Sequence, residues 1–455
     1  MAFLDSNYLL TNDTARRIYE KIKDLPIIDA HNHADVKAIR KNENYPNIWY
    51  IEAATDHYVW ELLRKRGIEE KYITGNASPK EKWMKLAEVF PYFIGNPVYE
   101  WVHLDLRRRL SIDELINKDN AEIIWNKATE ILRKKEFRPQ ALLKDMNVEV
   151  MCSTDDPLDL LEDHKALKDE DCQTKILPTW RPDKLMQINK DTFLDYLQKL
   201  GERTNKAIQK LDDLIESLQQ THDYFEQVGA KASDHGIEIP YGYNVEYEEA
   251  NQIFLKRISG KKVNDNEVKA FKSYMLHQFG QMNEESNWVM QLHIGAVRDI
   301  RDSLYMTIGP DSGGDVSNHM IPIVEPLKPF LNTFDGKLEI ILYCLDPNHY
   351  STLATLTRAF GEKVNLGAAW WFNDSPIGMK RQLEYIGTVD LLSNFAGMVS
   401  DSRKLMSYGS RTEMFRRVFS DVLGKQVEKG QIPLPLAMKT AKYVCYERKK
   451  ELFNF

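Results

Sequence analysis

The hydrophobic pattern of the chain consists of short apolar runs, each followed directly by polar residues and separated by charged segments. Several of the runs are continuously apolar, as is typical of parallel strands buried on both faces. The pattern therefore predicts eight strands, at 26–33, 148–157, 175–183, 230–236, 289–296, 338–346, 364–374 and 396–402.

The segments between most of these runs have helical periodicity, and 191–220 is a long example. Strands that alternate with helices indicate β–α–β units and a parallel sheet. Eight such strands predict a closed (β/α)8 barrel, the TIM barrel. The chain has 455 residues, and barrels with insertions reach more than about 400.

One connection is much longer than the others. Between the first and second predicted strands, residues 41–140 are rich in aromatic and charged side chains and have mostly helical patterns. A structureless loop of this length is improbable inside a compact domain. We therefore expect an α/β protein in which 1–40 and 141–455 form the barrel and 41–140 form a mostly helical insertion.

Composition narrows the class of partner and the compartment. The formal net charge is -7, from 61 basic and 68 acidic residues, which argues against a nucleic-acid binder and favours a small-molecule partner. No apolar stretch reaches the roughly 18 residues of a membrane span, and the N-terminus lacks a signal-peptide pattern. The four cysteines form no CxxC pair, so a reduced, cytoplasmic compartment is expected.

The first predicted strand ends in the most specific local motif, Asp29-Ala30-His31-Asn32-His33. Residues i and i+2 of a strand point to the same face, so both histidines can bind one ion. Neutral imidazoles suit zinc, and a catalytic zinc site takes about three protein ligands and keeps an open position. Asp401, at the end of the last run, is the candidate third ligand and a candidate general base. Taken alone, it is equally typical of a helix N-cap.

Polar residues at other strand ends are candidates for substrate binding. Arg181 follows the third run, and its guanidinium matches a carboxylate bidentately. A surface pair with Asp183 is the alternative interpretation. Arg403 shares the last strand end with Asp401. These placements predict an anion-binding face, because the carboxyl ends of barrel strands form the active-site face.

Two aromatic motifs add candidates. Asp56-His57-Tyr58 lies in the predicted insertion before an amphipathic helix, where His57 and Tyr58 can reach the barrel mouth. As an isolated triplet it is more typical of a helix start capped by Asp56. Trp370 and Trp371 end the seventh predicted strand, so one is expected to line the pocket and the other to pack in the core.

Together these residues make the sequence resemble the uronate isomerase family of the amidohydrolase superfamily, essentially from end to end. The motifs that carry the resemblance are DAHNH (29–33), TDHYVWELLRKRG (55–67), TWRPDK (179–184), SDHG (233–236), HIGA (293–296), AWWFND (369–374) and SDSRKLMSYGSRTEMFRR (400–417). The resemblance implies a distorted (β/α)8 barrel with an extra helical domain after strand one.

The resemblance also implies the chemistry and the site. It implies one divalent metal ion, usually zinc, held by residues that match His31, His33 and Asp401. His57, Tyr58, Arg181 and Arg403 match residues that contact substrate or carry protons, and Trp370 or Trp371 matches a pocket tryptophan. The implied reactions convert D-glucuronate to D-fructuronate and D-galacturonate to D-tagaturonate, by proton transfer through an enediol.

Several alternatives stay open at this point. His293 ends the fifth run and is either an additional metal ligand or, slightly favoured, a hydrogen-bond donor to substrate. A metal-dependent hydrolase on the same barrel would share the histidine pair and Asp401. A catalytically silent sugar-acid binding protein is a third interpretation. The sequence also allows a homo-oligomer but names no interface.

Overall fold

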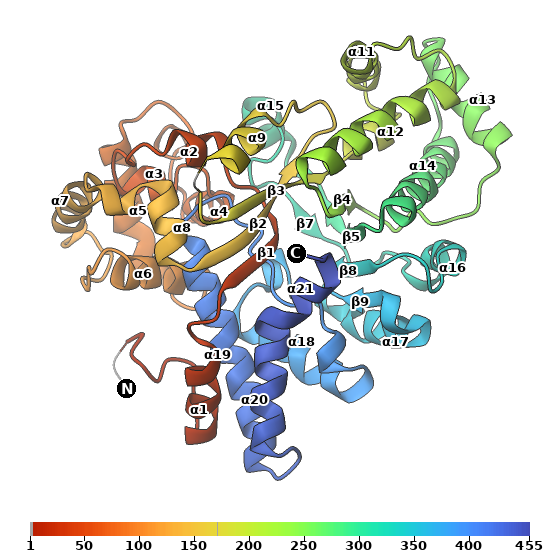
Figure 1. Cartoon of the computed structure of the whole chain (residues 1–455). Coiled ribbons are helices and arrows are strands. Elements are labelled where there is room, and N and C mark those ends of the chain that lie inside the picture. Colours follow the sequence, from red (N-terminus) through yellow and green to blue (C-terminus); the bar gives the residue numbers. More distant parts are fainter. Residues whose placement is uncertain (1–2, 171) are drawn as a thin grey trace.

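A computed structural model describes residues 3–170 and 172–455, and its described residues form a curled, parallel, seven-stranded sheet surrounded by helices (Figure 1). The strand order is β1-β2-β3-β4-β5-β8-β9, and every neighbouring pair is parallel. The strands are β1 (Ile27–Asn32), β2 (Val148–Asp155), β3 (Lys175–Trp180), β4 (Ala232–Ile237), β5 (Val289–Ile294), β8 (Ile340–Cys344) and β9 (Val364–Leu366). The predicted α/β class and parallel sheet are confirmed.

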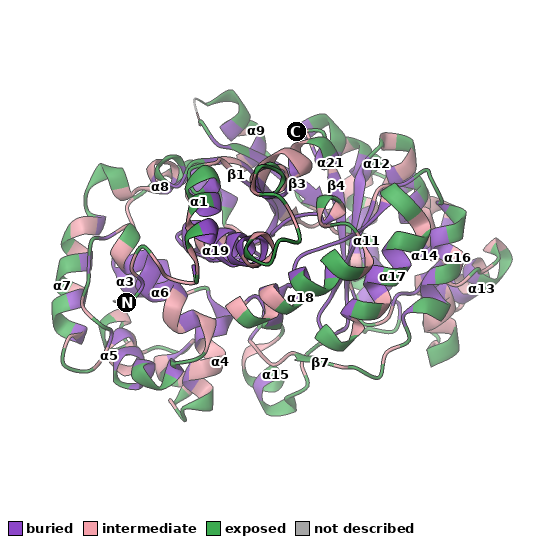
Figure 2. Cartoon of the chain, turned by 90° about the horizontal axis from the view of Figure 1, so that it is seen from below, coloured by how far each residue is buried: buried purple, intermediate pink, exposed green. Residues whose placement is uncertain are grey.

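Helices surround the sheet, and the strands are therefore buried on both faces. All residues of β1, β5 and β8 are buried, and Figure 2 shows buried segments inside a shell of helices with exposed outer faces. The helices outside the long β1–β2 connection include α1 (Asp13–Ile22), α9 (Glu162–Asp169), α10 (Asp183–Met186), α11 (Phe193–Thr204), α12 (Leu211–Val228), α13 (Tyr247–Ile258), α14 (Asp265–Ser286), α16 (Val324–Thr333), α17 (Tyr350–Phe360), α18 (Pro376–Val389), α19 (Ser407–Glu428), α20 (Leu434–Lys442) and α21 (Arg448–Phe453).

The long connection between β1 and β2 is mostly helical, as its sequence pattern predicts. It contains α2 (Val36–Lys41), α3 (Ile48–Glu52), α4 (His57–Lys65), α5 (Pro79–Val89), α6 (Pro97–Arg108), α7 (Ala121–Leu132) and α8 (Pro139–Asp145). Local signals set the helix starts. Asp56 caps α4 by accepting a hydrogen bond from the backbone N–H of Tyr58, and Ser78 and Glu81 form a capping box on α5.

The eighth predicted strand, 396–402, is not a regular strand in the structure. Gly397 and Asp401 have φ of +85° and +49°, outside the extended region that a strand requires. The segment still runs between the two ends of the sheet. The N–H of Ala396 donates to Leu366 O at 3.0 Å, and that of Asp401 donates to His31 O at 3.1 Å.

Side chains replace the missing ladder along this segment. Lys449 of α21 donates to the carbonyl oxygens of Ile28 and Met398, and the Asp29 carboxylate accepts from the N–H of Ser400 at 2.8 Å. Buried backbone groups need partners, and here a lysine and an aspartate supply them. The hydrophobic pattern alone does not distinguish this arrangement from a strand.

The seventh predicted strand, 364–374, is shorter than expected. Strand β9 ends at Leu366, where the next residue, Gly367, passes the ring of Tyr343 so closely that a Cβ there would lie 2.3 Å from a ring carbon. Trp370 and Trp371 therefore lie beyond the strand, and Trp371 begins a 3-10 turn, η6 (Trp371–Asn373). The expectation that these tryptophans alternate between pocket and core is wrong, because they do not share a strand.

The chain after β5 forms a feature that the sequence pattern did not predict. A short antiparallel hairpin of β6 (Ala296–Val297) and β7 (Val316–Ser317) encloses α15 (Asp302–Ile308). Among the described residues, the structure has no helix long and apolar enough to cross a membrane.

Candidate active site

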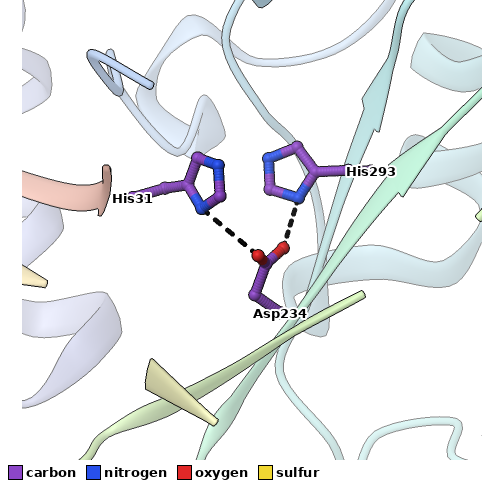
Figure 3. A group of neighbouring side chains, drawn as sticks. All are labelled: His31, Asp234 and His293. Atoms are coloured by element: carbon purple, nitrogen blue, oxygen red, sulfur yellow. Dashed lines mark hydrogen bonds and ion pairs between the residues drawn. The ribbon is translucent and has the colours of Figure 1, made fainter. Parts of the chain in front are cut away.

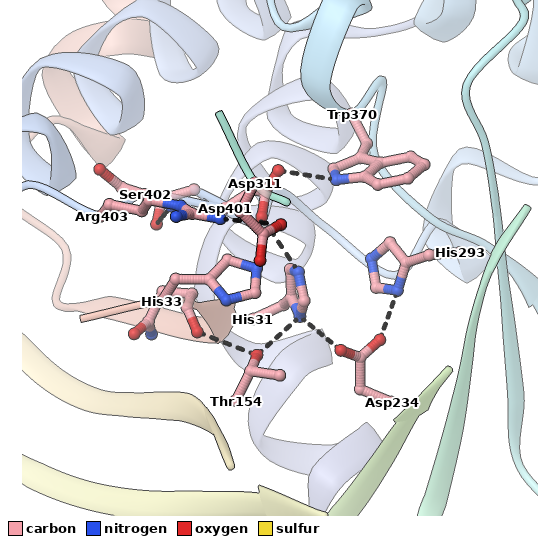
Figure 4. Close-up of polar contacts among 12 residues, drawn as sticks. His31, His33, Thr154, Asp234, His293, Asp311, Trp370, Asp401, Ser402 and Arg403 are labelled. Atoms are coloured by element: carbon pink, nitrogen blue, oxygen red, sulfur yellow. Dashed lines mark hydrogen bonds and ion pairs between the residues drawn. The ribbon is translucent and has the colours of Figure 1, made fainter. Parts of the chain in front are cut away.

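The two histidines of the first strand meet Asp401 at the carboxyl end of the sheet (Figure 4). Asp401 Oδ1 lies 3.2 Å from His31 Nε2 and 3.1 Å from His33 Nε2. Backbone hydrogen bonds fix this geometry, because Asp401 N–H donates to His31 O and His33 N–H donates to Ser402 O at 2.9 Å. The predicted partners are thus adjacent although they lie 370 residues apart in the chain.

Asp234, in the middle of β4, links the histidines of two other strands (Figure 3). Its Oδ2 lies 3.5 Å from His31 Nδ1, and its Oδ1 lies 2.6 Å from His293 Nδ1. Arg181 NH1 approaches the same carboxylate at 3.1 Å. Burial raises the pKa of Asp234, but Arg181 and the histidines outweigh it and hold the pKa well below its usual range. Asp234 is therefore an ionised acceptor.

Two groups of donors in the described part of the chain converge closely enough to hold a metal ion, His31–His33–Asp401 and His31–Asp234–His293. In each group the candidate ligand atoms lie within 4.8 Å of one another. The first group matches the imidazole and carboxylate ligands of catalytic zinc sites. In that arrangement Asp234 faces the other nitrogen of His31, as outer carboxylates do behind metal-bound histidines.

The protonation states agree with a cation in the first group. Burial lowers the pKa of His33 to about 4, so its imidazole is neutral at pH 7. His31 is more deeply buried than His33, yet Asp234 and Asp401 raise its pKa. The two carboxylates thus favour positive charge at His31, which a divalent ion would supply on displacing the proton.

Tyr58 and His57 reach the site from the start of α4. The Tyr58 hydroxyl lies 3.5 Å from Asp401 Oδ2, and the rings of His57 and Tyr58 stack at 4.7 Å. His57 Nδ1 is paired with Glu61 at 3.3 Å. Burial, followed by the negative charge of Asp401, raises the pKa of Tyr58 well above its usual value. The phenol is therefore neutral.

Both tryptophans face the site, in different ways. Trp370 donates from Nε1 to Asp401 Oδ2 at 2.9 Å and packs edge-on against His293. Trp371 lies 5.7 Å from His57, measured between ring centroids, and the guanidinium of Arg298 lies 4.9 Å above its ring. Trp370 thus orients the carboxylate of Asp401, and Trp371 forms part of the wall beside His57.

Three arginines give this end of the sheet positive charge. Arg181 pairs with Asp183 at 2.7 Å as well as with Asp234, so the Asp183 pair proposed as an alternative coexists with a place in the site. Arg403 NH2 lies 3.5 Å from Asp311, and Arg298 NH1 lies 4.0 Å from the same oxygen. The Arg403 contact is too long for a strong hydrogen bond, which leaves its guanidinium available to an anion. Arg298 is instead held by an ion pair to Asp315 at 2.7 Å.

His293 has one ring nitrogen, Nδ1, hydrogen-bonded to Asp234, while its other nitrogen, Nε2, makes no such bond within the described part of the chain. An ionised Asp234 only accepts, so Nδ1 of His293 carries the hydrogen. Burial lowers the pKa of His293 to about 4, and the ring is neutral. Its Nε2, which is buried and has no partner among the described residues, is then an acceptor or a metal ligand, not the hydrogen-bond donor favoured from the sequence.

Sequence reasoning missed several residues of this site. Asp234 lies in the SDHG motif, to which the sequence assigns no role, and neither Arg298 nor Asp311 stands out in the sequence. The β6–β7 hairpin brings Arg298 and Asp311 to the site, and no hydrophobic periodicity in the sequence predicts this hairpin. The SDHG motif contained a signal for Asp234, because it places a carboxylate at a barrel strand end.

A parallel sheet with two imidazoles, a carboxylate and arginines at its carboxyl ends defines an α/β protein with a candidate metal centre. Comparisons with known proteins make the class more specific. The family model of glucuronate isomerase matches residues 1–453, and the chain belongs to this family.

Individual relatives agree over the full length. A uronate isomerase of Thermotoga sp. (strain RQ2) is 52% identical over 451 residues, which cover 99% of each chain. The crystal structure of uronate isomerase from Thermotoga maritima, also 52% identical, has a TM-score of 0.98 and covers 100% of both chains. That of glucuronate isomerase from Caulobacter crescentus is 27% identical, with a TM-score of 0.95, and covers 99% of this chain and 97% of the other. The resemblance seen in the sequence motifs is confirmed.

Proposed function

We propose that this protein is a uronate isomerase that converts D-glucuronate to D-fructuronate and D-galacturonate to D-tagaturonate. The observation that carries the proposal is the family match over residues 1–453, which includes every residue of the candidate site. The substrates are anionic sugar acids, and the local arginines fit them although the net charge of the chain is -7.

His31, His33 and Asp401 are the proposed ligands of one divalent ion, with zinc the expected metal. When bound, such an ion supplies positive charge that orients and polarises substrate oxygens. His293 Nε2 is the proposed acceptor for a substrate hydroxyl. Arg181 and Arg403 hold the substrate carboxylate or a neighbouring oxygen, since guanidinium groups match carboxylates in shape and charge.

The chemical step moves a proton from C2 to C1 of the open-chain sugar. It requires a base at C2 and positive charge near the enediolate oxygens. Asp401 and Tyr58 are the candidates for the proton transfer, and their 3.5 Å contact lets a proton taken by one pass to the other. Arg403 and His57 are the proposed partners of the enediolate oxygens. Trp370 and Trp371 shape the pocket, the first by holding Asp401.

Proton NMR of D-glucuronate and D-galacturonate in D2O, with zinc or with chelator, tests this function. We expect the ketose to form with deuterium at C1, and the reverse reaction to place deuterium at C2 of the recovered aldose. Ketose without deuterium would keep the isomerase but replace solvent exchange by a shielded proton or a hydride shift. If neither uronate gives a ketose under any metal condition, the proposal is wrong; activity on lactones or acyl amino acids would then indicate a hydrolase, and binding without turnover a silent receptor.

Variants of the two proton-transfer candidates test the site. Asp401→Asn and Tyr58→Phe remove the base and the phenol, and general acid–base groups contribute typically about 10²–10⁴-fold to rate. We expect each variant to lose turnover on this scale. Near-wild-type turnover in both would contradict the assignment. Asp346→Asn is the matched control, because Asp346 also follows a strand but caps the turn after β8.

The finer architecture is also part of the proposal. We propose that 396–402 completes a distorted (β/α)8 barrel made of 1–40 and 141–455, and that 41–140 form a helical unit beside its mouth. The bonds from this segment to Leu366 and His31 support the closure. A cytoplasmic location is proposed because Cys152, Cys344 and Cys445 are buried thiols. Sedimentation analysis tests the proposed homo-oligomer.

A further inference from the structure

Arg411, the last residue of the SYGSR stretch that begins α19, is a fully buried charge beside the candidate site. Only 1% of the residue is exposed. Its guanidinium carbon lies 4.8 Å from the centroid of the Tyr58 ring and 4.1 Å from that of Trp101. Cations over aromatic faces are attracted by the ring quadrupole, and more strongly where water is excluded. Arg411 thereby packs against the Tyr58 ring, in a buried layer that also includes Trp101 of α6.

The same side chain also holds the segment that carries Asp401. Arg411 NH1 donates to the carbonyl oxygen of Ser400 at 2.5 Å and lies 3.3 Å from Asp374 Oδ2. Ser400 is the neighbour of Asp401, and Asp374 ends the AWWFND motif that contains both tryptophans. One guanidinium therefore contacts α4 through Tyr58, the 396–402 segment through Ser400, and the chain after β9 through Asp374.

We infer that Arg411 is a positioning residue for the proton-transfer pair: it holds the Tyr58 hydroxyl at the distance from Asp401 that the reaction needs. The Tyr58–Asp401 contact is 3.5 Å, at the upper limit of a hydrogen bond, so the pair does not hold itself together. The positions of its two members are set from outside, and Arg411 contacts both Tyr58 and the backbone next to Asp401.

This inference rests on the proposed function for its kinetic part. Proton transfer is sensitive to placement, and a misplacement of 1 Å by a remote mutation costs roughly 100-fold. Loss of Arg411 removes a support of the reacting geometry but no group that binds the substrate carboxylate. The expected signature is a lower kcat with a little-changed KM, which marks an interaction needed in the transition state alone.

The decisive variant is the double substitution Arg411→Met with Asp374→Asn. Methionine keeps the packing between the rings, and asparagine avoids leaving a buried carboxylate without its cation. Asp374→Asn alone is the companion variant that retains Arg411. We expect the double variant to lose about 100-fold in kcat, with KM changed less than about threefold and zinc content equal to wild type.

Arg417→Met is the matched control on the same helix. Arg417 is also buried, with its guanidinium 4.3 Å from the Tyr19 ring and an ion pair to Glu413 at 2.9 Å, but it anchors the N-terminal segment. This control should lower the thermal midpoint and leave kcat within about twofold of wild type. Equal losses of kcat in the Arg411 and Arg417 variants would reduce the effect to general destabilisation and overturn the inference.

Arg411→Lys gives a second variant that keeps the charge and folds with Asp374 paired. A lysine is a point charge. It lacks the planar guanidinium, which can stack on two rings and donate to a carbonyl oxygen at the same time. We expect it to lose at least about tenfold in kcat. Full activity of this variant, or of the Arg411→Met/Asp374→Asn protein, would overturn the inference.

Crystal structures of the wild-type and double-variant proteins separate this inference from the proposed function. The expected result is a displaced Tyr58 ring and a longer Tyr58–Asp401 distance in the variant. That comparison needs no substrate, so it holds even if the wild-type protein turns over no uronate. An unmoved Tyr58 would overturn the inference while leaving the isomerase proposal intact.

Discussion

At the residue scale, the carboxylate of Asp234 connects the candidate metal ligands to the anion-binding groups. It faces His31 Nδ1, accepts from His293 Nδ1 and pairs with Arg181. A carboxylate behind a ligating imidazole fixes its tautomer and raises its basicity. The chemistry of the site is therefore decided partly by a residue that need not touch the metal.

Asp234→Asn tests this role. Removal of such an outer carboxylate costs typically about 10–100-fold in metal affinity, and we expect a loss of this size in a zinc competition titration. Asp183→Asn is the control, because Asp183 pairs with the same Arg181 and does not contact His31. Equal zinc affinity of Asp234→Asn and wild type would show that Asp234 does not support His31.

Asp155, half-buried at the end of β2, predicts a pH dependence of stability. Burial raises its pKa from 3.8 to about 7. The unfolded chain thus releases this proton at lower pH than the folded chain, so stability falls as pH rises from about 4 to about 7 and then levels off. Asp155→Asn should remove the loss, on the order of 4 kcal/mol at pH 8 and almost nothing near pH 4.

The measurement is chemical unfolding of Asp155→Asn and wild type at both pH values, with chelator present throughout. The exposed Asp191→Asn provides the control, because it removes the same charge at the surface. A stability difference that is equal at both pH values would contradict the raised pKa of Asp155.

The residues that sequence could predict are those whose chemistry follows from local spacing. His31 and His33 share one strand face, and Asp401 ends an apolar run, so a common site follows from strand geometry. Arg411 lies in a helix whose hydrophobic periodicity predicts a buried face but not the residues that this face contacts. Its partners, Tyr58 and Ser400, are fixed by tertiary packing, which no local pattern contains.

At the scale of elements, a buried lysine joins the helices of the long connection to the loop after Asp401. Lys404 Nζ lies 2.7 Å from Glu52 at the end of α3, 3.4 Å from Asp105 on α6 and 4.0 Å from Asp56, the N-cap of α4. All four residues are buried. The position of α4, which carries His57 and Tyr58, thus depends on one charge cluster.

The two sides of this cluster should respond differently to mutation. Burial raises the pKa of Glu52, against the opposing effect of Lys404, and so favours the protonated carboxyl. Glu52→Gln should therefore change the free energy of unfolding by less than about 1 kcal/mol. Lys404→Met leaves the remaining carboxylates without a cation and should cost about 3–5 kcal/mol. Urea unfolding at pH 7 measures both, and equal costs would contradict the assigned protonation.

The secondary structure could be predicted where an apolar run forms a regular strand that is hydrogen-bonded only to its neighbouring strands. For that reason β1, β2, β3 and β5 lie within their predicted ranges, and β4 extends one residue beyond its range. The prediction failed at 396–402, where an apolar run is bonded by Asp29 and Lys449, and after Leu366, where Gly367 passes over Tyr343. In both places side chains distant in sequence decide the backbone conformation.

At the scale of the whole molecule, metal binding and folding should be linked. An ion that binds only the folded chain stabilises it by about 2.7 kcal/mol at a concentration of 100 Kd. We expect zinc to raise the thermal midpoint of the wild-type protein and chelator to lower it again. Asp401→Asn should abolish the increment, and Asp346→Asn should retain it. A zinc-dependent rise of equal size in Asp401→Asn would place the ion elsewhere.

The separation of 370 residues between His31 and Asp401 has a consequence for synthesis on the ribosome. When only the first strands have emerged, the chain offers the two histidines but not the carboxylate that completes the group. An incomplete or C-terminally truncated product therefore lacks the full ligand set, however well its early strands have formed. The candidate metal centre thus joins an early and a late segment of the polypeptide, and it can form only after translation has passed residue 401.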